Sequence, residues 1–224
     1  MSDPAPNSEL MSSLANLIRG LSALFWGLPV ALLSCVQPDV FNWFKPFGFL
    51  IPPAATGLLL YGTRQLSFFQ KQERVWLKSV DTTAVLAMIN LGLSPFLYFW
   101  NQFPGNPFFG QSVGLMALTG LGFLLCLNHL LYRLATMLPD EMLRHETRIF
   151  TAFNSGLLAV LSLLVLSFFF MQYVRFVPRP LLRVMDLGRP IMLVFLVLLP
   201  LAMTMTLLWK TKETILASVF RGQK

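Results

Sequence analysis

The sequence predicts an all-α polytopic membrane protein with six transmembrane helices. Hydrophobic residues make up 55% of the 224 residues and charged residues only 12%, which leaves more apolar surface than a soluble domain can hide. Residues 149–174 contain no Asp, Glu, Lys or Arg. About 20 apolar residues cross a hydrocarbon core of about 30 Å, so this run is long enough to span a bilayer. Residues 82–132 are also uncharged and far exceed one crossing, so a turn must divide them.

Proline-rich turns and charged segments divide the chain into the six spans. The run Gln37-Pro38-Asp39 ends the first span, and residues 101–107 separate the third from the fourth. Pro52 and Pro53 either kink the second span or mark its start, because neither donates a backbone hydrogen bond. Residues 64–79 mix basic and aromatic side chains, which suits a segment lying in the membrane interface. The predicted spans are 12–34, 46–63, 82–100, 110–132, 150–174 and 190–209, all within one transmembrane domain covering residues 1–224.

The distribution of basic residues predicts the orientation. Lysine and arginine concentrate in residues 64–79, 133–148 and 210–224, which lie on one side of a six-span protein. That side should be the cytoplasm, which places both termini there. We therefore expect a multi-pass protein of the cell membrane, with a bacterial inner membrane favoured. The net charge of +7 then reports orientation and contact with anionic lipid rather than nucleic-acid binding.

Weak sequence similarity recurs along the chain. Each even-numbered span ends in two leucines, an aromatic residue and nearby basic charge, and an asparagine lies about two turns into each odd-numbered span. This pattern suggests three tandem helical hairpins in the same orientation. The alternative is that any helix entering a positively charged cytoplasm ends in this way. The three asparagines are Asn16, Asn90 and Asn154.

Polar residues inside the predicted spans are the first candidates for a functional site. The three asparagines either converge as a polar cluster or hold helices together by interhelical hydrogen bonds, and the second reading is favoured. Arg19 either marks an intramembrane site or extends to lipid phosphate, again with the second favoured. His129 is the only histidine in a predicted span, so this chain alone cannot supply two histidines to a haem. A single ligand to a pigment or haem shared with another subunit stays open, and we predict no cofactor or metal site of the chain's own.

Small residues predict close helix packing. Glycines and alanines are frequent in the second and fourth spans, with a Gly-x-x-x-Gly step at Gly110 and Gly114. Such residues let helix backbones approach closely. We therefore expect these two spans to pack centrally.

Arginines between the fifth and sixth spans form the second candidate site. Arginine pairs bidentately with phosphate or carboxylate, and only Asp186 opposes the positive charge of this segment. We predict an outer-face site for an anionic lipid head group or an acidic partner. The alternative is that the arginines simply rest on outer-leaflet phosphates. The four residues are Arg175, Arg179, Arg183 and Arg189.

The motifs of common enzymes are absent from the sequence, including Gly-x-Ser-x-Gly, His-Glu-x-x-His, Cys-x-x-Cys and the Walker loop. We expect a non-catalytic integral membrane protein that acts as a scaffold or accessory subunit of a larger membrane complex. The alternative is a small transporter or lipid-handling module that binds an anionic lipid or substrate at the outer face. A transporter should have discontinuous helices, which Pro52-Pro53, Pro95 and Pro200 would produce if they break their spans. Expected partners are anionic membrane lipids and other membrane-protein subunits, and not nucleic acid.

Overall fold

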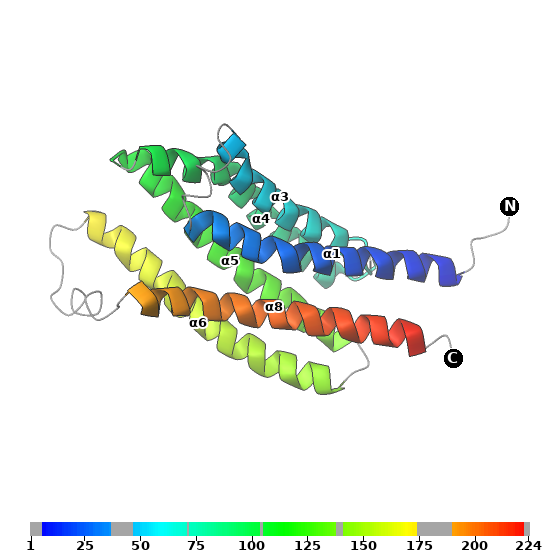
Figure 1. Ribbon diagram of the computed structural model, residues 1–224. Coiled ribbons are helices and arrows are strands. Elements are labelled where there is room, and N and C mark those ends of the chain that lie inside the picture. The colour runs from blue at the N-terminus through cyan, green and yellow to red at the C-terminus, as the bar shows by residue number, and fades with distance from the viewer. Residues whose placement is uncertain are drawn as a thin grey trace.

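The computed structural model describes residues 6–36, 47–70, 72–103, 105–137, 141–173 and 190–221, and every regular element in these ranges is helical (Figure 1). Each predicted span overlaps a helix within the described residues. The elements are α1 (Pro6–Val36), the 3₁₀ turn η1 (Phe47–Leu50), α3 (Ile51–Leu66), α4 (Arg74–Gln102), α5 (Pro107–Met137), α6 (Glu141–Tyr173) and α8 (Pro190–Arg221).

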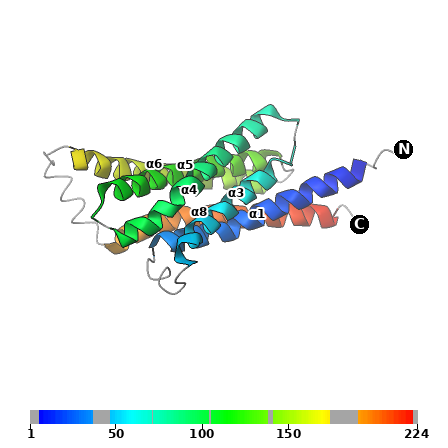
Figure 2. The same cartoon turned by 90° about the horizontal axis from the view of Figure 1, so that it is seen from above.

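The six α-helices form a closed bundle. Each helix packs against the next one along the chain, and α8 returns to pack against α1. The rings of Phe25 and Trp209, with centroids 5.6 Å apart, lie at this closing contact. α5 also contacts α8, so it meets three other helices. Both ends of the described chain lie at the same end of the bundle (Figures 1 and 2).

Leucine dominates the core. Leu17, Leu21 and Leu24 of α1 are fully buried at helical spacing, so one face of α1 is committed to the interior. Leu127, Leu130, Leu131 and Leu134 do the same for α5. Large apolar side chains remain exposed around the perimeter, as for Leu163 at 69%. An apolar perimeter of this kind is typical of a surface that faces lipid.

α1 and α3 pack closely where two glycines face each other. A Cβ atom added to Gly20 would lie 2.8 Å from the carbonyl oxygen of Gly62, so the two backbones nearly touch. The glycines of α5 are less crowded: a Cβ on Gly110 would meet its nearest neighbour at 3.9 Å and one on Gly122 at 3.7 Å. α5 contacts three other helices, but the close backbone approach expected at its small residues is not found at Gly110 or Gly122. A Gly-x-x-x-Gly step indicates that small residues line one face of a helix, but not that another helix packs against that face.

Four of the described helices are long and apolar enough to cross a membrane. These are residues Met11–Cys35 of α1, all of α4, all of α5, and Arg144–Ser167 of α6. α3 has 16 residues and is about 24 Å long, less than the hydrocarbon thickness of about 30 Å. The protein is thus an all-helical chain with multi-pass membrane character.

The helices extend beyond the predicted spans at their charged ends. α4 begins at Arg74 and α8 runs to Arg221, whereas the uncharged runs predicted 82 and 209. The described residues of 64–79 therefore do not form a separate element, and their position in the membrane interface stays a prediction. These residues are the end of α3, a turn that includes Gln70 at φ 45°, and the first turns of α4. The helical backbone hydrogen bonds thus continue beyond the first charged residue at the end of each uncharged run.

Prolines start or interrupt the hydrogen-bond ladder without ending a helix in the middle. Pro52 and Pro53 occupy the first helical positions of α3, which confirms that they mark its start. Pro95 lies inside α4 and removes the backbone donor for the carbonyl of Leu91. The hydroxyl of Ser94 donates to that carbonyl at 2.7 Å. α4 therefore remains continuous.

Within the described helices, the charged residues lie toward one end of the bundle. The Lys, Arg, Asp and Glu residues of the described helices all lie toward the end that carries the termini (Figure 1). The opposite halves of the same helices have none. This separation fits an apolar slab bounded on one side by a basic interface.

Candidate functional site

A buried polar centre joins α5, α6 and α8. Asn128 of α5, Asn154 of α6 and Thr204 of α8 are each fully buried. The Nδ2 group of Asn154 donates to Oγ1 of Thr204 at 3.0 Å, and Nδ2 of Asn128 donates to the same oxygen at 3.2 Å. The threonine hydroxyl thus links three helices. Amides and a hydroxyl at such a site are expected to fix the helix register.

The position of Thr204 one turn after Pro200 builds this centre locally. The carbonyl of Pro200 accepts the hydroxyl of Thr204 at 2.8 Å and Nδ2 of Asn154 at 3.2 Å. A hydroxyl bonded to the carbonyl four residues earlier is a common way to place Ser or Thr inside a helix. Here the Pro200 carbonyl also accepts a hydrogen bond from Asn154 of the neighbouring helix α6. α8 is therefore tied to α6 through both backbone and side chain.

Asn90 makes a separate contact. It is 6% exposed on α4, and its Oδ1 accepts the hydroxyl of Thr119 on α5 at 2.7 Å. Asn90 and Asn154 therefore have different partners on different helices, and the described contacts do not join them in one cluster. Asn16 is half-buried on α1. The site brings in Asn128 and Thr204, which the periodic spacing of asparagines did not identify.

Arg19 lies near the charged end of the bundle. It is exposed, and its neighbour Gly20 packs against Gly62 in the last turns of α3. Arg19 is thus level with the end of α3 rather than with the middle of the bundle. This position suits a side chain that reaches to lipid phosphate.

A line of buried oxygens continues from the polar centre along α6 and α8. Oδ1 of Asn154 and the hydroxyls of Thr147, Thr151 and Thr211 are buried and have no hydrogen-bond partner among the described residues. Toward the charged end, Nζ of Lys210 bonds to the carboxylate of Glu146 and again joins α8 to α6. The α6–α8 interface is thus the most polar of the described helix contacts.

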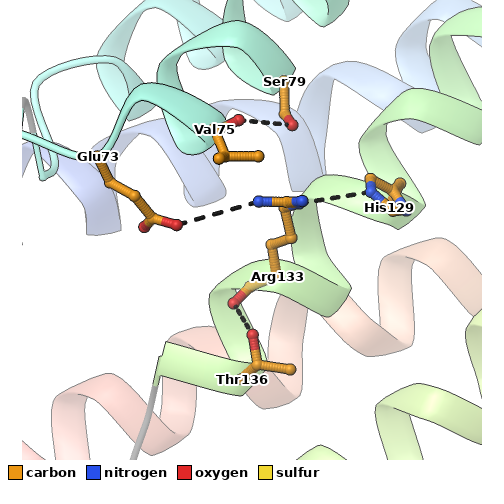
Figure 3. A network of polar contacts seen from close by, with 6 residues as sticks. All are labelled: Glu73, Val75, Ser79, His129, Arg133 and Thr136. Carbon is orange, nitrogen blue, oxygen red and sulfur yellow. Dashed lines mark hydrogen bonds and ion pairs between the residues drawn. The ribbon is translucent and has the colours of Figure 1, made fainter.

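His129 belongs to a polar network at the surface of the charged end (Figure 3). Nε of Arg133 donates to Nε2 of His129 at 3.4 Å, and NH1 of Arg133 lies 4.0 Å from a carboxylate oxygen of Glu73. The histidine is exposed on α5, where a cofactor of another subunit has access. A ligand at Nε2 would have to displace Arg133, because that nitrogen is already the acceptor. The network ties the start of α4 to α5.

The predicted outer arginine site lies outside the described residues. Arg175, Arg179, Arg183 and Arg189 all fall between α6 and α8, so the prediction of an anion site there remains a prediction. Within the described residues, no three His, Cys, Asp or Glu side chains lie close enough together to hold a metal ion.

The polar centre consists of neutral groups. Amides and hydroxyls do not titrate near neutral pH, so this centre can orient and bind but does not exchange protons by itself. No family model, curated protein or solved structure matches the chain. Its function must therefore be argued from the geometry.

Proposed function

We propose that the protein is a non-catalytic scaffold or accessory subunit of a larger membrane complex. The proposed arrangement has six membrane crossings in three tandem hairpins, with both termini in the cytoplasm. α3 would cross as the shortest span together with η1. Basic residues gather at the end of the bundle that carries the termini, which supports this orientation through the positive-inside tendency.

The exposed face of α6 is the observation that carries the proposal. α6 is the least buried of the four candidate spans. Gly156 lies on its outer face, and a Cβ atom added there would meet nothing within 4 Å. Ala152 and Ala159 are exposed on the same face. Small residues three and four apart on an open face allow a second transmembrane helix to approach closely.

The interior supports the same reading. The amides of Asn90, Asn128 and Asn154 hydrogen-bond to threonines of neighbouring helices, so these polar groups serve packing within the chain. Surfaces for a partner then lie on the perimeter. The outer arginine segment stays a separate hypothesis for anionic lipid or substrate binding.

The test compares two leucine substitutions that should leave the chain's own packing intact. Gly156→Leu adds bulk to the outer face of α6, and Gly92→Leu adds the same bulk to α4, where a Cβ also meets nothing within 4 Å. The tagged chain is extracted gently from its native membrane, and the mass and composition of the complex are measured. We expect a stoichiometric membrane-protein partner that is retained by the Gly92 variant and lost by the Gly156 variant. A protein that is extracted without any partner subunit would overturn the proposal.

A further inference from the structure

A groove on the lipid-facing side of α4 combines a cationic end with an apolar end. It is largely open, has a volume of about 640 Å³, and is lined by Arg74, Leu77, Lys78, Asp81, Thr82, Val85 and Leu86. These positions recur every three or four residues, so they share one face of the helix. Leu86 at its inner end lies against Gly122 of α5, at 3.7 Å from a Cβ added there.

The groove straddles the expected edge of the hydrocarbon layer. Residues 82–102 of α4 carry no charge, and at about 1.5 Å per residue this run matches a hydrocarbon core of about 30 Å. Arg74 and Lys78 precede it and belong in the head-group layer. Val85 and Leu86 follow inside the core, about 18 Å from Arg74 along the helix. The lining of the groove thus changes from charged to apolar at the membrane depth where a lipid's head group meets its acyl chains.

The cations of the groove are available to a ligand. Arg74 and Lys78 are exposed, and the ion pairs among the described residues involve other side chains. They are four residues apart on one helical face, so their positive charges repel each other. A phosphate bound between them would relieve this repulsion and accept hydrogen bonds from both. Asp81 lies one turn closer to the core and repels phosphate, so the phosphate should lie on the Arg74 side.

We propose that this groove binds one anionic phospholipid, with its phosphate on Arg74 and Lys78 and its acyl chains along Val85 and Leu86. Charge complementarity selects this occupant, because two cations above an apolar wall match a negative head group above hydrocarbon chains. The site is independent of the α6 face and lies at the opposite end of the bundle from the predicted outer arginine site.

The test measures lipid retention by native mass spectrometry of the full chain, with phosphatidylglycerol and phosphatidylcholine of identical chains as probes. The double variant Arg74→Gln/Lys78→Gln should bind phosphatidylglycerol about 25-fold more weakly, at about fivefold for each cation. The control Arg64→Gln/Arg148→Gln removes the same charge from exposed positions of α3 and α6 and should retain the lipid.

A second pair of variants tests the apolar end without changing charge. Val85→Trp fills the groove and should displace the lipid, whereas Val160→Trp on the exposed face of α6 should not; the two valines are 55% and 54% exposed. Thermal unfolding of each variant checks that the fold is kept. Equal loss from the two charge variants would refute the site, as would full retention by Val85→Trp or equal retention of the two lipids by the unaltered chain.

Discussion

The crossing of α1 and α3 makes the sharpest stability prediction. A Cβ atom on Gly20 would lie 2.8 Å from the carbonyl oxygen of Gly62 and 3.0 Å from Cβ of Gln65. Both neighbours belong to α3 or are fixed directly to its backbone, so no side-chain rotation relieves the contact. Gly20→Ala therefore requires the two helices to move apart by several tenths of an ångström.

The expected cost follows from two opposing terms. Overpacking of a tight interface costs about 1–3 kcal/mol, while replacing glycine by alanine within a helix gains about 0.5–1 kcal/mol. Gly92→Ala isolates the second term, because a Cβ there meets nothing within 4 Å. We expect the free energy of unfolding of Gly20→Ala to lie about 1–3 kcal/mol below that of Gly92→Ala. Reversible unfolding by denaturing detergent in mixed micelles measures both.

Two further variants sharpen the reasoning. Gly62→Ala meets Cγ of Leu24 at 2.8 Å and the carbonyl oxygen of Gly20 at 3.0 Å, so it should be as costly as Gly20→Ala. The double variant should cost less than the sum, because one separation of α1 from α3 relieves both contacts. Gly27→Ala should be milder, since its nearest neighbour is a terminal methyl of Leu59 at 2.8 Å. If Gly20→Ala were as stable as Gly92→Ala, the two helices could not be packed this closely.

Three other substitutions test the polar contacts by the same unfolding measurement. Thr204→Val removes two interhelical hydrogen bonds at about 0.6 kcal/mol each. It should therefore lower the free energy of unfolding by about 1 kcal/mol more than Thr206→Val, whose hydroxyl bonds only within α8. Equal stability of the two variants would contradict the hydrogen bonds that join α5, α6 and α8 at Thr204. Ser94→Ala leaves the Leu91 carbonyl without a side-chain donor beside Pro95 and should cost about 1 kcal/mol; no loss would mean that the hydroxyl does not compensate for the proline. Glu73→Gln should change stability by less than about 1 kcal/mol, because its 4.0 Å ion pair with Arg133 is solvent-accessible; a larger loss would show that the network of Figure 3 is structural.

Helix positions were predictable from the sequence because uncharged runs and turn residues mark them directly. The turn at residues 101–107 was confirmed by the end of α4 at Gln102 and the start of α5 at Pro107. Helix ends on the charged side were not predictable in the same way. Hydropathy detects the edge of the hydrocarbon layer, whereas a helix such as α4 continues to Arg74 because its backbone bonds do not depend on side-chain charge.

The buried polar centre was only partly predictable. The sequence singled out Asn90 and Asn154 as intramembrane polar residues, and both are buried and make interhelical hydrogen bonds. It did not identify Asn128 or Thr204 as partners, because spacing along one helix says nothing about the register of its neighbour. The one available signal was local: a threonine one turn after Pro200, where its hydroxyl can bond to the proline carbonyl.

The helix continuity at the internal prolines Pro95 and Pro200 bears on the choice between scaffold and transporter. A transporter site formed by broken helices needs carbonyls that are free to coordinate a substrate or ion. In α4 the carbonyl of Leu91, which Pro95 leaves without its backbone donor, accepts the Ser94 hydroxyl. A side chain of α4 thus occupies the carbonyl that a transport site at Pro95 would use. This arrangement supports the proposal that other molecules act on the perimeter of the bundle, above all on the open face of α6 and in the groove on α4.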